Sequence, residues 1–415
     1  MDYSKPIDNA LFPKGCERCS FTQFSLFMLI PTALLIWGVI AAFVVLYQGL
    51  GTTGLDDKFG FGLWITLDLA VIALGAGAFF TGLLRYILNI DELKNIVSFT
   101  AVVGFLCYTG AMLILVLDIG QPIRAWFGYW YPNVHSMLTE VIFCITCYCI
   151  VLIIEYIPLI LEQRLFEKNT FIQHLAHNFH VYMPLFAGIG AFLSTFHQGS
   201  LGGMYGVLFG RPYIFRDGFF IWPWTFFLYL LSAVSAGPMF SVLMATLMEK
   251  ITGKKLVSWK IKQLMGKIGG TMLIVYTIGK FLDSYAWVND VLPRSGLTFE
   301  QMFTGFVYSS VWFYAEHIAL VIGIVCMALP ALRKIPAFFY LGCFVTCFSI
   351  VLNRFVMTVQ ALGIPVMPFE EWRWYWANWA EWGAFALVLG YAIITIAVTY
   401  RYCPLFPQEA ELNKK

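Results

Sequence analysis

The sequence predicts an all-α, polytopic membrane protein with ten transmembrane helices, and its composition is the first reason. Of the 415 residues, 60% are hydrophobic and 12% are charged, and the mean hydropathy is +0.76. Soluble domains carry about 25% charged residues, so this chain has too few polar side chains to cover a water-facing surface. A soluble enzyme and a disordered chain are therefore excluded. The net charge of +2 also argues against a nucleic-acid-binding protein.

The second reason is that the apolar residues form continuous runs. A helix that crosses a hydrocarbon core about 30 Å thick needs roughly 20 apolar residues. Ten runs of this kind cover 22–48, 61–87, 95–118, 134–158, 171–196, 219–248, 268–289, 302–328, 336–360 and 378–401. Continuous runs predict helices in a lipid bilayer and not the alternating strands of a membrane barrel. The first run lacks the cleavage site of a signal peptide, so we expect it to be retained.

Two sets of four consecutive runs, spans 2–5 and spans 6–9, show signs of an internal repeat. Asp118 near the end of the third run has a counterpart in Asp283 near the end of the seventh, and Glu140 in the fourth has a counterpart in Glu316 in the eighth. This repeat predicts two four-helix bundles, spans 2–5 and spans 6–9, with spans 1 and 10 outside them. The expected segments are an N-terminal segment (1–21), a peripheral span (22–60), a first bundle with the candidate pocket (61–218), a second bundle (219–360), a second peripheral span (361–401) and a tail (402–415).

The basic residues predict the orientation in the membrane. Positively charged residues gather on the cytoplasmic side. With the N-terminus in the cytoplasm, the other side holds only Lys58, Arg124, Arg211, Arg216, Arg294 and Arg373. Two more of the 26, Lys280 and Arg354, lie inside runs, and the rest fall on the cytoplasmic side. We therefore expect a multi-pass protein of the bacterial inner (cytoplasmic) membrane with both termini in the cytoplasm.

Cysteine and histidine positions argue against a metal centre in this chain. Most of the ten cysteines lie inside apolar runs, where Cys behaves as a small hydrophobic residue. Cys16-x-x-Cys19 has no second pair nearby, as a zinc or iron–sulfur site would need. Two b-type haems would need four histidines at matching depths, and the six in this chain are not so placed. We expect no bound haem or metal.

Polar side chains on four consecutive runs point to one pocket on the outer side. The ends of these runs carry Asp68, Asp118, Gln121, Arg124, His135, Glu140, His197 and Gln198. Ionisable residues inside a bilayer are costly and mark functional sites by default. Quinone reduction takes two electrons and two protons, and it needs an apolar slot, hydrogen-bond donors and buried acids. The chain carries no evident redox centre, so the electrons must come from a partner.

A second group of ionisable residues lies in the inner half of span 5 and in spans 7 to 10. Its members are His177, His180, Lys280, Asp283, Glu316, His317, Arg354 and Glu381. Two interpretations remain open for spans 7 to 10, an internal neutralising network and a proton route. The histidines of span 5 form either hydrogen bonds between helices or the lower part of a proton path from the cytoplasm.

The end of the third span resembles a known family. Leu117-Asp118-Ile119-Gly120-Gln121-Pro122-Ile123-Arg124 is similar to the L-D-x-G-x-P-x-R signature of the NrfD/PsrC family of haem-free, quinone-reactive membrane subunits. The ten spans and the segment 194–202 look like its long, HybB-like branch, and most of all like the membrane subunits of menaquinone reductase complexes of sulfate-reducing bacteria.

The resemblance implies menaquinone as substrate in a pocket on the periplasmic side. The family's signature residues would be Asp118 and Arg124, its span-4 acid Glu140, and its span-5 ending His197 and Gln198. The implied partners are a ferredoxin-like iron–sulfur subunit on the periplasmic face, a molybdopterin-oxidoreductase-like subunit and a multihaem cytochrome c. Iron–sulfur clusters and haems would be held only by these partners.

The residues and the resemblance together predict roles within the pocket. Glu140 donates a proton, Asp68 reloads it, Asp118 and Arg124 shape the mouth, and His135 or His197 bonds a ring carbonyl. The outer loops 119–133 and 197–218 dock the partner through Trp126, Trp130, Tyr131, Tyr205 and Phe209, unless these rings form an interfacial aromatic belt. The alternatives to a quinone-reactive subunit are a proton or ion transporter and a pure membrane anchor.

Overall fold

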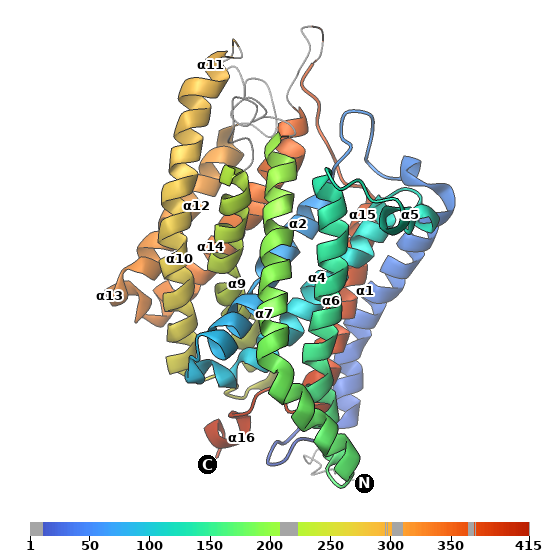
Figure 1. The fold of residues 1–415 in the computed structure, drawn as a ribbon, viewed down its shortest axis with the longest axis vertical. Coiled ribbons are helices and arrows are strands. Elements are labelled where there is room, and N and C mark those ends of the chain that lie inside the picture. Colours follow the sequence, from blue (N-terminus) through green and yellow to red (C-terminus); the bar gives the residue numbers. More distant parts are fainter. Residues whose placement is uncertain are drawn as a thin grey trace.

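The protein is an elongated bundle of helices (Figure 1). This structure is a computed structural model, and it describes residues 11–207, 223–294, 296, 298–300, 310–363, 369 and 371–414. All regular elements within these residues are helical. The N-terminal and C-terminal segments lie at the same end of the bundle, which we call the terminus side. The other end is the opposite side.

Ten long helices form the bundle in the part of the chain that the structure describes. They are α1 (Phe21–Gln48), α2 (Leu63–Gly75), α4 (Val97–Asp118), α6 (Met137–Leu161), α7 (Thr170–Val207), α9 (Pro223–Thr252), α10 (Trp259–Ala286), α12 (Ser310–Ala328), α14 (Pro336–Phe355) and α15 (Trp379–Tyr402). Helix α2 continues through α3 (Gly77–Gly82). Three π-helical turns extend other elements: η2 (Leu83–Ile87) after α3, η6 (Trp287–Val291) after α10 and η8 (Val356–Gln360) after α14.

Each predicted run contains one long helix, although not every helix meets the criteria for a membrane span. Among the described residues, 9 helices are long and apolar enough to cross a membrane. Helix α10 is not one of them, because Lys260, Lys262, Lys267 and Lys280 lower its hydropathy. The start of the run 302–328 lies outside the described residues. The all-helical, multi-pass fold is confirmed, and the count of ten crossings stays a prediction.

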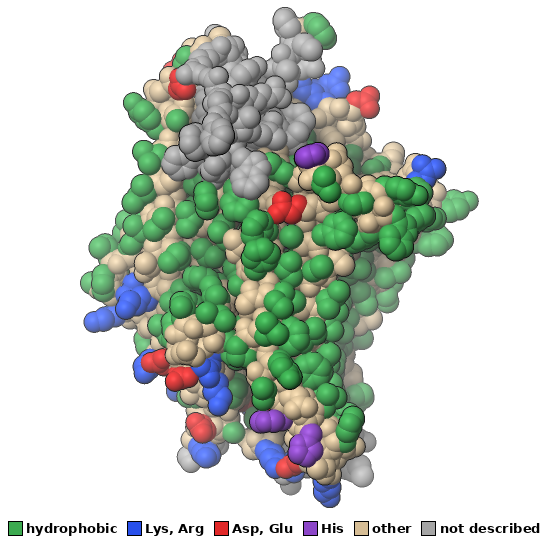
Figure 2. Space-filling model, in the orientation of Figure 1, with side chains coloured by type: hydrophobic (Ala, Val, Ile, Leu, Met, Phe, Trp, Pro, Cys, Tyr) green, Lys and Arg blue, Asp and Glu red, His purple; other side chains and the backbone are tan. Residues whose placement is uncertain are grey.

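Figure 2 supports placement in a membrane. Hydrophobic side chains cover the middle of the face that it shows, and most of the Lys and Arg side chains in view lie towards the terminus side. Helix α1 shows how such a surface arises, because only four of its residues, Pro31, Gly38, Ala41 and Val45, are buried. Its remaining apolar side chains are exposed or half-buried, as those of a helix at the lipid-facing edge of a bundle would be.

The packing places the helices in two neighbouring sets. In the first, α2 and α3 pack against α4, α4 packs against α6, and α6 packs against α7. In the second, α9, α10, α12 and α14 pack in sequence, and α14 returns to α9. Helix α9 also contacts α2, α3 and α7, so it joins the two sets. Helix α1 packs along α15, and α15 packs on α4.

Two predicted boundaries were wrong. The outer loop expected at 197–218 begins later, because α7 continues to Val207 and carries His197, Gln198 and Tyr205 inside the helix. The fourth run was expected from residue 134, but α6 begins at Met137 after the N-cap Ser136, which leaves His135 outside the helix. Residues 208–222, which include the expected partner contact Phe209 and the basic residues Arg211 and Arg216, lie outside the described residues.

Candidate functional site

Two acids of the predicted pocket approach each other on the opposite side of the first helix set. Asp68 on α2 is 2% exposed, and it interacts electrostatically with Asp118 at the end of α4. Within the described residues, Oδ1 of each acid is buried without a hydrogen-bond partner. Small residues bring α2 and α4 close enough for this, since a Cβ on Gly75 would collide with Cys107. The two carboxyl groups are therefore available for a ligand.

His197 and Gln198 lie in the core of the same helix set and not in a surface loop. They are 0% and 1% exposed. Gln198 Nε2 donates to Ile72 O at 3.0 Å. This carbonyl is free to accept because Ala76 N, its usual donor in a continuous helix, donates to Ala73 O at the break between α2 and α3. The ring of His197 lies beside the backbone of Val141. Neither of its nitrogens makes a hydrogen bond of normal geometry to the described residues.

Hydroxyl groups extend this buried cluster towards the middle of the bundle. Tyr108 OH and Ser194 Oγ are 2.6 Å apart, and Gln198 Nε2 lies 3.5 Å from the same phenol. The ring of Tyr108 packs edge-on against Tyr148, with 4.6 Å between centroids. Sequence reasoning missed these groups, because a Tyr or Ser inside an apolar run is common and signals little.

The other residues predicted for the pocket lie nearer the surface. Gln121, Arg124 and His135 are exposed, and Glu140 in the first turn of α6 is half-buried. Arg124 lies in η4 (Pro122–Arg124) and forms no ion pair with Asp118 among the described residues. The structure therefore places Asp68 near Asp118 and buries His197 and Gln198 in the same helix set, whereas Gln121, Arg124, His135 and Glu140 lie nearer the surface.

A further acid reaches Asp118 from α15. The Glu381 side chain is buried and accepts hydrogen bonds from Gly54 N at 2.8 Å, Asn378 N at 3.0 Å and Tyr375 OH. It interacts electrostatically with Asp118. The sequence placed Glu381 with the second helix set. The capping-box spacing of Asn378-x-x-Glu381 was the signal that it serves as a helix cap at this site.

The predicted partner contacts are only partly accessible. Trp126, Trp130 and Tyr131, in and beside α5 (Phe127–Trp130), are 47%, 73% and 77% exposed. Tyr205 is 3% exposed and packs against Phe61 at 5.5 Å between ring centroids. The prediction that Tyr205 forms this contact was therefore wrong, since the longer α7 carries it into the core.

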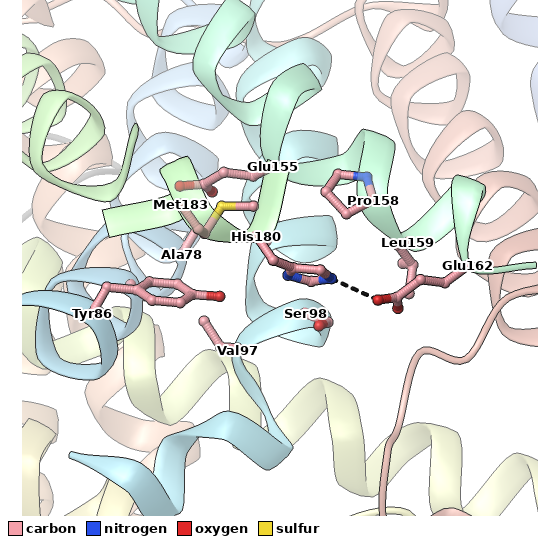
Figure 3. Close-up of a pocket in the computed structure, with 12 residues that line it drawn as sticks. Ala78, Tyr86, Val97, Ser98, Glu155, Pro158, Leu159, Glu162, His180 and Met183 are labelled. Atoms are coloured by element: carbon pink, nitrogen blue, oxygen red, sulfur yellow. Dashed lines mark hydrogen bonds and ion pairs between the residues drawn. The ribbon is translucent and has the colours of Figure 1, made fainter. Parts of the chain in front are cut away.

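A pocket opens on the terminus side of the first helix set (Figure 3). Its cavity volume is about 30 Å³, and it lies between η2, α4, α6 and α7. Its polar lining residues are Tyr86, Ser98, Glu155, Glu162 and His180. His180 Nε2 lies 2.6 Å from Glu162 Oε1, the contact drawn as a dashed line in Figure 3. His180 and His177 are both exposed, and only His180 lines the pocket.

Sequence reasoning missed Glu155 and Glu162 in this pocket. They are seven residues apart on α6 and its C-cap, a spacing that places both on one helix face. That spacing was the available signal.

The ionisable residues of the second helix set meet in one buried network. Lys280 Nζ lies 2.9 Å from Glu316 Oε1, and Asn353 Nδ2 donates to the same oxygen at 3.0 Å. His317 bonds Ser284 Oγ at 2.9 Å and Phe313 O at 2.8 Å. Asp283 is also buried, at 7% exposure. This geometry fits both interpretations that the sequence left open.

No group of three or more His, Cys, Asp or Glu side chains that could hold a metal ion occurs among the described residues.

Comparisons with known proteins agree with the resemblance at the end of α4. The family model described as polysulphide reductase, NrfD, matches residues 51–365. The menaquinone reductase integral membrane subunit of Nitratidesulfovibrio vulgaris is 66% identical over 417 residues, covering 100% of this chain and 99% of that protein.

Two more distant relatives belong to other complexes. A selenate reductase subunit of Mesobacillus selenatarsenatis is 19% identical over 94% of this chain and 96% of its own length. The probable Ni/Fe-hydrogenase 2 b-type cytochrome subunit of Escherichia coli is 28% identical over 38% of this chain and 39% of its own length. The predicted relationship is confirmed.

Proposed function

Because the chain belongs to the NrfD polysulphide reductase family, we propose that it is the quinone-interacting membrane subunit of a respiratory complex that reduces menaquinone. The observation that carries this proposal is a set of buried polar side chains on α2 and α7 of an apolar helix bundle, Asp68, His197 and Gln198, with Asp118 of α4 near Asp68. The 66% identity with a menaquinone reductase subunit over the whole chain supports the choice of quinone.

These side chains can supply the protons and the hydrogen bond that quinone reduction requires. The ring takes two electrons from the partner and two protons from the chain, which yields the quinol. A carboxyl group buried without a counter-ion keeps its proton, so Asp68 and Asp118 are suited to donate one to a ring oxygen. His197 is held in the core with its nitrogens unused, and we assign it the hydrogen bond to a ring carbonyl.

The residues near the mouth take supporting roles. Gln198 is fixed by the Ile72 carbonyl, so it orients α7 against α2 beside the ring. Glu140, half-buried on α6, passes protons to or from the inner acids. Gln121, Arg124 and His135 line the entrance for the quinone head group.

Protons for this reaction would enter through the pocket of Figure 3. His180 and Glu162 lie at its rim, and Glu155 interacts electrostatically with Tyr148 on the same helix. Tyr148 packs on Tyr108, which reaches Gln198 and Ser194. These groups form a polar path through the first set towards Asp68. Uptake from the cytoplasmic side to a pocket on the periplasmic side would make turnover electrogenic.

The second helix set and the topology complete the proposal. The first set (61–218) is the quinone bundle, and the second (219–360) is its structural counterpart, in which Asp283, Glu316, His317 and Arg354 form a further proton relay or a neutral core. All ten long helices cross the inner membrane, with the terminus side in the cytoplasm. Helix α10 is suited to the second bundle interior, since Lys280 is neutralised there by Glu316.

The electron donor would dock on the opposite side. The exposed rings of Trp126, Trp130 and Tyr131 offer a rigid aromatic contact for a ferredoxin-like iron–sulfur subunit. A molybdopterin-oxidoreductase-like subunit and a multihaem cytochrome c would complete the complex and hold its clusters and haems.

Purification in mild detergent tests this function. The complex should contain an iron–sulfur subunit and co-purify with menaquinone, and it should reduce menadione, a soluble naphthoquinone, from a reduced donor. A complex that assembles but binds and reduces no quinone would favour a pure anchor. A chain that purifies alone and moves protons or ions through vesicles without a donor would favour a transporter.

A further inference from the structure

Arg354 on α14 is a buried guanidinium without a carboxylate partner. It is 1% exposed, and it forms no ion pair among the described residues. Nη1 donates to Asn353 Oδ1 and Nη2 donates to Ser232 Oγ, both at 2.7 Å, while Nε has no hydrogen-bond partner. A buried charge that only neutral groups contact is costly. Such a cation can stabilise a negative charge that forms on a neighbouring group during the reaction.

Two phenol rings connect Arg354 to the acid cluster of the first helix set. The guanidinium lies over the ring of Tyr229 on α9, 3.6 Å from its centroid. Tyr229 interacts electrostatically with Tyr205 on α7, and Tyr205 interacts with both Asp68 and Asp118. A cation over an aromatic face in a dry interior is a strong contact. The positive charge of the second set therefore lies against α9, the helix that contacts α2, α3 and α7 of the first set.

The backbone around Arg354 also joins the two helix sets. Directly after Arg354, α14 passes into the π-helical turn η8, and such turns are frequent at functional sites. Within the turn, Thr358 Oγ1 donates to Arg354 O at 2.7 Å and lies 2.6 Å from Thr66 Oγ1 on α2. Helix α2 carries Asp68, so the turn fixes the position of α2 relative to α14, the helix of Arg354.

Other charges near Arg354 do not cancel its effect. They are Glu316 on α12 and Lys280 and Asp283 on α10, with the phenols Tyr229 on α9 and Tyr276 on α10. Lys280 and Glu316 neutralise each other, and the amide of Asn353 stands between Glu316 and Arg354. Arg354 thus carries a charge that no carboxylate among the described residues neutralises in an ion pair, and it lies against α9.

We propose that Arg354 is a positioning residue for quinone reduction. When a proton leaves Asp68 or Asp118 for a ring oxygen of the quinone, a carboxylate remains, and the charge of Arg354 stabilises it through Tyr229 and Tyr205 until solvent protons restore the acid. The proposal rests on the quinone function above. It adds that the second helix set tunes the acids of the first.

The test measures menadione reduction by the purified complex as a function of pH. Arg354→Gln removes the charge, so the acids should hold their protons to higher pH and give them up less readily. We expect kcat to fall at least about threefold at pH 7, and the alkaline limb of the rate profile to move up by about half a pH unit or more. The bound menaquinone content and KM should change little, because the residue does not touch the quinone.

Two variants separate a charge effect from a packing effect. Arg354→Lys keeps the positive charge. Ser232→Ala removes one hydrogen bond of Arg354 and leaves the Arg354 side chain in place. Both should retain the alkaline limb of the original protein. A profile for Arg354→Gln that keeps its shape at every pH would overturn the proposal, even with a lower rate.

A third variant covers the case in which Arg354→Gln fails to assemble. Tyr229→Leu removes the ring that carries the interaction and leaves Arg354 in place, so it should move the alkaline limb upward as well. An unmoved limb in this variant would also refute the proposal. If the original complex does not reduce menadione at all, the proposed function fails, and not only this inference.

Discussion

The acids of the opposite side differ in what their carboxyl groups contact. Glu381 is held by three hydrogen-bond donors, which fix it as a structural cap. Asp68 is buried beside Asp118 with one oxygen unused among the described residues. A residue that donates protons must be able to lose them without breaking its surroundings. Asp68 meets that condition and Glu381 does not.

Asp68→Asn should therefore abolish most quinone reduction. The amide keeps the size and polarity of the side chain but cannot donate the carboxyl proton. Loss of a general acid costs roughly 10²-fold or more in rate, so menadione reduction should fall at least about tenfold with normal assembly. Asp57→Asn makes the same chemical change at an exposed position and should leave the rate unchanged. Full activity in Asp68→Asn would mean that the acid is structural.

Glu140→Gln gives the second residue-scale prediction. Glu140 is half-buried at the start of α6, where it can exchange protons between the inner acids and the mouth. We expect at least about a tenfold loss of quinone reduction, again with intact assembly. The rate should be measured together with the set of subunits present in each preparation. If only Glu140→Gln keeps full activity, proton transfer bypasses the mouth and the path from the terminus side gains support.

The sequence was informative where a polar residue interrupts an apolar run. Asp68, Asp118, His197 and Gln198 were all found in this way, since a charge or amide in a membrane span is rarely accidental. The partner of Gln198 was not predictable, because it is a backbone carbonyl freed by the break between α2 and α3. Nothing in the Gly75-Ala76-Gly77 sequence says which side chain will fill that gap.

Helices α1 and α15 show how small residues determine packing at the scale of elements. A Cβ on Gly38 would collide with Leu387, a Cβ on Gly383 would collide with Ala41, and a Cβ on Gly390 would lie 2.6 Å from Pro31 O. Between membrane helices, close approach through small residues replaces the hydrophobic driving force. The sequence predicted both helices as peripheral, but the spacing of these glycines alone could not show that they pack against each other.

Gly390→Val should loosen this pair of helices. The added side chain meets backbone that cannot rotate away, and overpacking of this kind costs about 1–3 kcal/mol. The purified subunit or complex should unfold at a lower temperature, with the sharpest rise in protease sensitivity around α1. Gly51→Ala is the matched control, because a Cβ there meets nothing within 4 Å. An unchanged unfolding temperature in Gly390→Val would show that α1 is free to shift.

A second element-scale feature ties the N-terminal segment to the tail. Arg18 Nη1 and Nη2 donate to Glu409 Oε1 and Oε2 at 2.5 and 3.0 Å, with both side chains at most 4% exposed. The pair joins the segment before α1 to α16 (Glu409–Leu412). Removing one partner of a buried pair costs about 3–5 kcal/mol, because the other charge stays unpaired.

Arg18→Met should consequently release the tail. Carboxypeptidase is expected to digest residues from Lys414 inward in the variant and to spare them in the original protein. The double exchange Arg18→Glu with Glu409→Arg should restore part of the protection, since the pair is re-formed with reversed charges. Equal digestion of the original and of Arg18→Met would show that the pair does not hold the tail.

At the scale of the whole molecule, the amino-acid composition alone was enough to predict a membrane protein. An apolar fraction of 60% with few charges left only a membrane protein, and the length of each run gave every long helix. Figure 1 then shows both terminal segments at one end, as an even number of crossings requires. What composition could not show is how the two helix sets meet, because that contact depends on single residues such as Thr66 and Thr358.

The orientation of the molecule in the membrane is predicted from its basic residues and can be tested with its own cysteines. Cys19 is exposed on the terminus side. Cys16 is half-buried, and burial together with the nearby Glu409 carboxylate raises the pKa of its thiol, so Cys16 should react slowly. A membrane-impermeant maleimide should therefore label Cys19 in inverted membrane vesicles and leave it unlabelled in intact spheroplasts.

Two variants make this labelling experiment decisive for topology. Cys19→Ser should lose the label in inverted vesicles, which identifies the reacting thiol. Asp57→Cys in the same background adds a thiol at an exposed position in the segment between α1 and α2, which follows the first crossing. It should react in spheroplasts and not in inverted vesicles. Labelling of Cys19 in intact spheroplasts would place the terminus side in the periplasm. The pocket of Figure 3 would then open towards the periplasm, and the proposed uptake of protons from the cytoplasm would fail with it.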